Sequence, residues 1–328
     1  MTAAIANAKP GTTNYCAVAF FGFISLATLP ALADGVEHHT PPFLPTGMAM
    51  FNTDSLLVWR DDGRLQIRDG KGVWSAVVQL PMQKIMQIRP DASGLLALGA
   101  PETPFGPSLI IALDPAGKES ERWSVAGAWD ITVSADARQA VTLSGVRPLL
   151  PQAAVGAEQA FPKWAGKRPE NPQFPPKLLY WEAATIYCHP ADLSMQHYAP
   201  ARCERPGAEG WIYEYGESMQ APVACGPWLV VNEGKHQEQL TVLEMATGKI
   251  RSRRKFHSHP RIACAGEDQL AIAERSLEQA QLPALNSTWH ASIGKDQIIE
   301  LAALPRYLAY RTEKSLDVIL MPSPRRSD

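Results

Sequence analysis

Three histidines in this chain carry side chains that could bind a metal ion. His257 and His259 are two residues apart, so both project to the same side of an extended segment. His236 and Glu233 lie in an earlier polar segment. Imidazole and carboxylate groups bind divalent metals such as zinc. The sequence therefore offers His236, His257 and His259 as candidate ligands. Exposed loop histidines without a metal are the commoner alternative, and the neighbouring basic run at 251–255 would oppose a cation.

Four cysteines follow residue 33, namely Cys188, Cys203, Cys225 and Cys264. An even number in an exported chain suggests two disulfides, for which three pairings exist. We expect Cys188–Cys203, which are near in sequence, and Cys225–Cys264, which occupy matching Val-Ala-Cys and Ile-Ala-Cys contexts. No C-x-x-C occurs, so neither a thioredoxin-like redox site nor a c-type haem is indicated.

A proline-rich stretch at 146–177 offers groups that could bind a partner. We expect it to join two strands as a long insertion, and such insertions are often functional. Phe161, Trp164 and Arg168 are of the types that anchor interfaces, and Trp164, between two lysines, is the best single candidate. A passive segment covering one end of the fold is the alternative.

Sequence motifs of several enzyme classes are missing. The chain has no G-x-S-x-G, H-E-x-x-H, P-loop or G-x-G-x-x-G segment. Catalytic residues, cofactor-binding residues and the identity of any cofactor therefore stay unassigned. The formal net charge is −2, which argues against a nucleic-acid partner because such proteins present a basic face.

The first 33 residues are typical of an export signal. An apolar run at 16–29 is followed by Pro30 and then Ala31-Leu32-Ala33, an A-x-A cleavage site. The mature chain would begin at Asp34, would keep no stable membrane span, and would be periplasmic or secreted. An uncleaved N-terminal anchor is the alternative.

Two short patterns recur with a common period of about 45 residues. The first is a strand, a polar turn with aspartate and a second apolar strand, at 86–98 and again at 130–143; its aspartates, Asp91 and Asp136, are 45 residues apart. The second is an apolar strand that ends in a Gly-Lys-like turn. It occurs around Gly72, Gly117 and Gly248, and more weakly at 292–295. Alternating or apolar segments bounded by Gly, Pro and Asp are typical of strands.

Four short strands in each period of about 45 residues describe one blade of a β-propeller. The turns Asp-Pro-Ala-Gly-Lys at 114–118 and Ala-Thr-Gly-Lys at 246–249 carry a resemblance to WD40-like and quinoprotein-like propeller repeats. The resemblance implies an all-β propeller of six to seven four-stranded blades, with the proline-rich insertion in one of them. The strands at 307–310 and 316–320 resemble the first strands and are expected to close the ring. A β-sandwich or two β domains is the alternative.

The predicted organisation is a signal peptide at 1–33, a linker at 34–45, a propeller at 46–321 with the insertion 146–177, and a tail at 322–328. In function, the sequence favours a non-catalytic propeller that binds a protein or an envelope component. One alternative is a propeller enzyme with its active site at the channel mouth, as in a lactonase-like hydrolase or a dehydrogenase subunit. The other is a metal-binding accessory protein.

Overall fold

The computed structural model describes residues 36–38, 43–51, 54–91, 93–103, 106–115, 117–134, 137–162, 175–182, 184–191, 200–216, 220–234, 238–293 and 296–320. Within these ranges the regular structure is all β. No helix long and apolar enough to cross a membrane is found among them.

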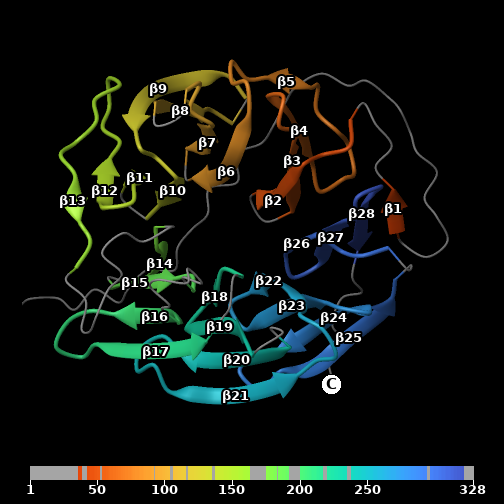
Figure 1. Ribbon diagram of the computed structural model, residues 1–328. Helices are drawn as coiled ribbons and strands as arrows, with labels where there is room; N and C mark the ends of the chain where they lie inside the picture. The colour runs from red at the N-terminus through yellow and green to blue at the C-terminus, as the bar shows by residue number, and fades with distance from the viewer. Residues whose placement is uncertain are drawn as a thin grey trace, which may run out of the picture.

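The described residues form seven four-stranded antiparallel sheets, arranged in a ring as the blades of a β-propeller (Figure 1). The sequence left the number at six or seven, and the structure has seven. Within each of the first six blades the strands follow one another from the inner to the outer edge of the sheet.

The first three blades contain the following strands. Blade 1 has β2 (Gly47–Phe51), β3 (Ser55–Trp59), β4 (Arg64–Arg68) and β5 (Val78–Gln79). Blade 2 has β6 (Ile85–Asp91), β7 (Gly94–Gly99), β8 (Pro107–Leu113) and β9 (Glu119–Ala126). Blade 3 has β10 (Asp130–Val133), β11 (Arg138–Val141), β12 (Gly145–Pro148) and β13 (Gln159–Ala160).

The next three blades continue the same order. Blade 4 has β14 (Lys177–Trp181), β15 (Ala184–His189), β16 (Ala201–Arg205) and β17 (Trp211–Gly216). Blade 5 has β18 (Val223–Cys225), β19 (Trp228–Glu233), β20 (Gln239–Glu244) and β21 (Ile250–Lys255). Blade 6 has β22 (Arg261–Gly266), β23 (Gln269–Ala273), β24 (Ser276–Gln281) and β25 (Asn286–Ser292).

Blade 7 closes the ring with strands from both ends of the described chain. It has β26 (Glu300–Ala303), β27 (Tyr307–Arg311) and β28 (Leu316–Leu320), and its outer strand is β1 (Val36–His38). In the β1–β28 pair, Val36 is opposite Ile319. The predicted closure is therefore confirmed, but the segment 34–45 is more than a linker, because it supplies this strand.

The hydrophobic core lies between neighbouring blades. Strand β7 is buried along its whole length, since the faces of a blade pack against the blades on either side. One cluster joins Leu57 and Leu65 of blade 1 to Ile85, Leu95 and Ile111 of blade 2. This packing explains why the middle strands read as continuous apolar runs in the sequence.

The recurrent glycine turn joins the third and fourth strands of a blade. Gly72, Gly117 and Gly248 follow β4, β8 and β20 and have φ values of 86°, 80° and 67°. Glycine tolerates this conformation because it has no Cβ. The weak copy at 292–295 is different, since it begins at the end of the outer strand β25.

The proline-rich segment 146–177 is not an insertion between a second and a third strand, as the sequence had suggested. It contains most of β12, the outer strand β13, the connection to blade 4 and the first residue of β14. The short strands of blade 3 and the prolines around them hid this pattern. Residues 163–174 of the connection from β13 to β14 lie outside the described ranges, so the face predicted for the insertion stays a prediction.

Candidate functional site

The inner strands of all blades begin at the same end of the ring, because each follows a connection from the outer strand of the blade before it. This end, together with the loops between second and third strands, is called the mouth face below. Charged residues begin four of the inner strands: Asp130, Lys177, Arg261 and Glu300. The axis of the propeller is therefore polar at the mouth face.

A pocket of about 180 Å³ lies against the inner strands of blades 2, 3 and 4. Its polar groups come from three strands, with Arg89 from β6, Asp130 and Thr132 from β10, and Lys177 and Tyr180 from β14. These five residues with the space between them are called the mouth pocket below. The pocket brings two cations and one carboxylate together.

Lys177 has an unusual electrostatic environment. Burial lowers the pKa of its ammonium group to about 8, and the positive charge of Arg89 acts in the same direction. The carboxylate of Asp130 opposes the shift only in part. Lys177 forms no hydrogen bond or ion pair with another residue of the described chain. Its amine is therefore partly neutral near pH 8 and available to a ligand.

Arg89 is held loosely in the pocket. Its Nη2 atom lies 3.9 Å from Oδ1 of Asp130, too far for a hydrogen bond. The same Oδ1 accepts a hydrogen bond from the backbone amide of Ile131 at 2.7 Å. The donors of Arg89 thus remain free of hydrogen bonds to the described residues, with 37% of the side chain exposed.

The opposite wall of the pocket is fixed by a bond between blades. The hydroxyl of Tyr180 in blade 4 donates to Oε1 of Gln139 in blade 3 at 2.6 Å. Burial raises the pKa of Tyr180, so the phenol stays a neutral donor. In blade 3, the backbone amide of Ile131 also donates to Oε1 of Gln87 in β6, at 3.2 Å. These bonds keep the three inner strands in register around the pocket.

Beside the pocket, large apolar side chains are exposed on the mouth face. Met86, Trp129 and Leu143 are 41%, 42% and 37% exposed, and they form what is called the mouth patch below. Trp129 precedes β10, and its backbone amide donates to Val141 at the end of β11. Leu143 lies just beyond that strand. Met86 is the neighbour of Gln87, which contacts blade 3 through Ile131.

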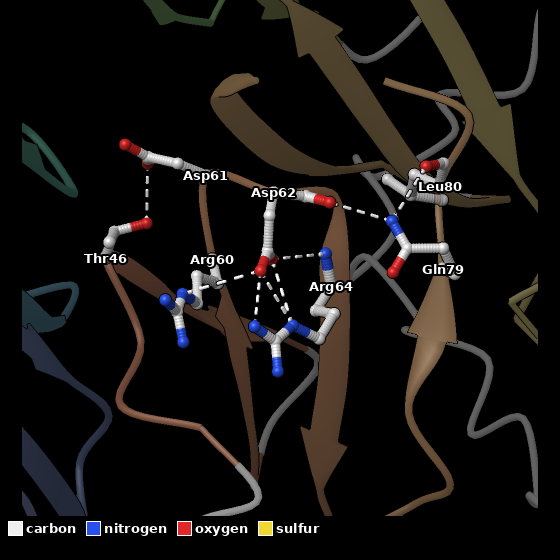
Figure 2. A network of polar contacts seen from close by, with 7 residues as sticks. All are labelled: Thr46, Arg60, Asp61, Asp62, Arg64, Gln79 and Leu80. Atoms are coloured by element: carbon white, nitrogen blue, oxygen red, sulfur yellow. Dashed lines mark hydrogen bonds and ion pairs between the residues drawn. The ribbon is translucent and has the colours of Figure 1, made fainter. Parts of the chain in front are cut away.

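Other polar groups on the mouth face are occupied by their own blade. In the turn between β3 and β4, Asp62 accepts hydrogen bonds from Nε of Arg64, and Oγ1 of Thr46 donates to Asp61 at 2.7 Å (Figure 2). Nε2 of Gln79 donates to the carbonyl of Asp62 at 2.8 Å. The hydrogen bond from Arg64 lowers the pKa of Asp62. This network stabilises a turn and leaves few groups for a ligand.

Glu300 is likewise used within the fold. Its carboxylate accepts hydrogen bonds from the backbone amide of Met48 at 3.2 Å and from Nε of Arg311 at 3.0 Å. Burial raises its pKa. The contacts tie blade 7 to blade 1, so Glu300 differs from the loosely held groups of the mouth pocket.

The predicted metal ligands are not brought together among the described residues. His257 and His259 are exposed in the connection between β21 and β22. Glu233 is buried and accepts hydrogen bonds from Tyr213 at 2.8 Å and from Gln239 at 2.6 Å. In the described ranges no group of three His, Cys, Asp or Glu side chains could hold a metal. His236 lies outside these ranges, so its role stays a prediction.

Of the three predicted partner anchors, the structure describes one. Phe161 is buried, packs edge-on against Tyr187 with ring centroids 6.0 Å apart, and belongs to the cluster between blades 3 and 4. It is therefore a core residue and not an exposed anchor, because its ring packs against Val141, Val146 and Leu178. Trp164 and Arg168 lie outside the described residues.

The four cysteines occupy two sites. Cys188 and Cys203 face each other on β15 and β16 and form the predicted disulfide. Cys225 and Cys264 are on the inner strands of adjacent blades, as expected, but they are free thiols in this structure, so the second predicted bridge is not formed in it. The two thiols are in hydrogen-bonding contact. A disulfide between them stays a prediction.

Sequence reasoning did not single out the mouth pocket or the mouth patch. Asp130 and Lys177 each stand directly before an apolar strand at the boundary between two repeats. A charged residue at that place in the repeat is the signal that could have found them. Arg89 gives no such signal, because it lies inside its strand.

The comparisons with known proteins agree with this architecture. No protein-family model matches the chain, and no curated protein matches it. Among solved structures, virginiamycin B lyase from Staphylococcus aureus has a TM-score of 0.60 at 12% identity, over 88% of this chain and 99% of that one. The Cps50 (Swd1) β-propeller domain of Myceliophteria thermophila has a TM-score of 0.64 at 11% identity, over 87% and 99%. BamB from Moraxella catarrhalis has a TM-score of 0.50 at 10% identity, over 84% of each chain.

The chain is a seven-bladed β-propeller. At these identities the similarity concerns the fold alone, which serves lyases and other proteins alike. What this propeller binds must therefore be inferred from its own residues.

Proposed function

We propose that this protein is an exported, non-catalytic β-propeller that binds a protein partner or an envelope component with its mouth face. The observation that carries the proposal is the mouth patch. Its three exposed apolar side chains lie near the starts of the inner strands β6 and β10 and just after β11, in blades 2 and 3, whose inner strands also line the mouth pocket. An apolar centre with Trp and Met beside a polar rim is typical of a protein interface.

Exposed apolar residues also occur away from the patch. Ile212 on the outer strand β17 and Leu320 at the end of β28 are 45% and 49% exposed, as much as the patch residues. They belong to different blades, far apart around the ring (Figure 1). Single exposed apolar residues of this kind are normal on a protein surface. They provide matched controls for the patch.

The leader at 1–33 supports export. Cleavage after Ala33 would leave β1, which begins at Val36, on the mature chain. A disulfide such as Cys188–Cys203 also persists best in an oxidising compartment. N-terminal sequencing of protein from the periplasmic fraction should find Asp34. Membrane-bound protein that begins at Met1 would contradict export in this form.

Site-specific photo-crosslinking in the producing cells tests the binding face. A benzophenone side chain placed at Trp129 or Leu143 should give an adduct of one common mass, and the same group at Ile212 or Leu320 should not. Trp129→Ala should weaken formation of the adduct at position 143 by roughly thirtyfold, the effect of losing about 2 kcal/mol. Equal adducts at all four positions, or none at the patch, would refute the proposal.

A further inference from the structure

Two basic side chains, Arg89 and Lys177, line the mouth pocket, and neither forms a hydrogen bond with a described residue. Among the described residues, Arg89 forms one ion pair, at 3.9 Å, and Lys177 forms neither a hydrogen bond nor an ion pair. The ammonium of Lys177 is penalised by burial, as its lowered pKa shows, and a buried charge without a partner costs free energy. Arg89 is more exposed, but its hydrogen-bond donors also lack an acceptor among the described residues, so an anion at the pocket would be favoured by both groups.

The charges in the pocket limit which anion fits. Arg89 and protonated Lys177 carry two positive charges and Asp130 carries one negative charge, so the pocket has a net charge of +1. A singly charged ligand neutralises this charge, while a doubly charged phosphate adds a negative charge beside Asp130. A guanidinium group also matches the planar fork of a carboxylate. A carboxylate thus fits the charge and the shape of the donors.

The size of the pocket points to a small group. Its volume of about 180 Å³ accommodates the end of a chain or a small acid and not a large ligand. The rest of the lining is mostly apolar and consists of Pro90, Ile131, Val133, Leu178 and Leu179.

We propose that the mouth pocket is a binding site for a monovalent carboxylate, held between the guanidinium of Arg89 and the amine of Lys177. The carboxylate could belong to a free small acid or to the end of a polypeptide chain, since the chemistry recognised is the same. The site does not depend on the mouth patch, so its failure and the failure of the proposed partner binding are distinguishable.

The reactivity of the Lys177 amine gives a direct assay. A bound carboxylate favours the protonated ammonium and covers it, so both effects slow acylation of Lys177. Folded protein is treated briefly with an acetylating reagent at pH 8, and the modified peptides are quantified by mass spectrometry. Lys118, exposed in the turn after β8, serves as the internal control. The probe is propionate, which replaces chloride at constant ionic strength.

Propionate should slow acetylation of Lys177 at least threefold and leave that of Lys118 unchanged. Arg89→Gln should abolish this protection, and circular dichroism should show that the variant is folded. Equal slowing of both lysines, or full protection in Arg89→Gln, would overturn the proposal.

Phosphate separates a carboxylate site from a general anion site. It should protect Lys177 weakly in the natural sequence, because Asp130 repels the second charge, and more strongly in Asp130→Asn. Phosphate that protects the natural protein as well as propionate does would overturn the assignment. Tetra-alanine identifies which kind of molecule supplies the carboxylate. If tetra-alanine with a free C-terminal carboxylate protects Lys177 and its C-terminal amide does not, the ligand is a chain terminus. If propionate alone protects Lys177, the ligand is a small free acid.

Discussion

Arg138 of blade 3 and Asp91 of blade 2 form an ion pair that joins the two blades. Nε of Arg138 lies 2.6 Å from Oδ2 of Asp91, and the side chain of Asp91 is only 3% exposed. Nη1 of Arg138 also lies 3.0 Å from Oε2 of Glu121 on the outer strand of blade 2. One arginine therefore links the inner and outer strands of the neighbouring blade.

Arg138→Met should destabilise the protein by about 3 kcal/mol. The substitution leaves the carboxylate of Asp91 buried without its charged partner, the costly way to break such a pair. Urea unfolding followed by fluorescence measures the loss. Arg122→Met is the control, because Arg122 pairs with Glu119 on the surface, and its loss should be at most about 1 kcal/mol. Equal effects of the two substitutions would show that the link between the blades adds nothing.

Gly248→Ala should be more harmful than the same change at Gly117. Both glycines have positive φ, so each alanine costs about 1 kcal/mol for its backbone conformation. A Cβ at Gly248 would also lie 2.6 Å from Cγ of Trp211, while one at Gly117 meets only Val78 Cγ2 at 3.2 Å. The extra clash should add about 1–3 kcal/mol. Thermal unfolding of the two variants compares them, and equal melting temperatures would contradict this.

These two sites show how much of the fold the sequence could predict. Asp91 and Gly248 belong to the two recurring patterns. Each pattern marks a tight turn between strands, and such turns recur from blade to blade. Trp211 follows no such pattern, yet its Nε1 donates to the carbonyl of Met245 in the next blade at 2.8 Å. Contacts between blades depend on distances in space, so the repeat revealed the blades and not the bonds that join them.

The site was harder to predict than the fold. The sequence drew attention to histidines and to a proline-rich stretch, because these residue types suggest a function even when the fold is unknown. Lys177 is informative only when β14 is known to be an inner strand, and the sequence had placed it as a third strand. That error followed from the two-residue strand β13, which is too short to show an alternating pattern.

Removal of β1 should weaken the ring. A chain that begins at Thr40 lacks Val36–His38, so the edge of β28 is left unpaired. Its melting temperature should fall by about 3 °C, corresponding to about 2 kcal/mol for a chain of this size. It should also aggregate more readily through the open edge. The comparison protein begins at Asp34. Identical melting temperatures and solubility would show that closure by β1 is not needed.

Mild oxidation should join Cys225 to Cys264. The hydrogen bond with Cys225 lowers the pKa of Cys264, which makes Cys264 the more reactive thiol. The same contact, and then burial, raise the pKa of Cys225. Peptide mapping after treatment with oxidised glutathione should find this pair linked. The bridge should raise the free energy of unfolding by about 2–4 kcal/mol, and Cys225→Ser should not respond to the oxidant. Two thiols that are still alkylated after oxidation in the folded protein would refute it.

The charge of Lys177 should make stability depend on pH in the alkaline range. Its pKa is about 8 in the folded protein and about 10.4 in the unfolded chain, so between these values the unfolded state binds more protons. The cost of holding a charged ammonium in the pocket is fully present below pH 8 and is relieved as the pH rises toward about 10.4.

Lys177→Met has no such group to titrate. The free energy of unfolding of the variant should therefore exceed that of the natural protein, and this excess should be about 2 kcal/mol larger at about pH 7 than at about pH 10. Urea unfolding of both proteins at the two pH values measures it. Taking the difference between the two proteins cancels the titration of the other groups. A difference that stays constant over this range would show that folding does not lower the pKa of Lys177. A difference that grows with pH would show that folding raises this pKa.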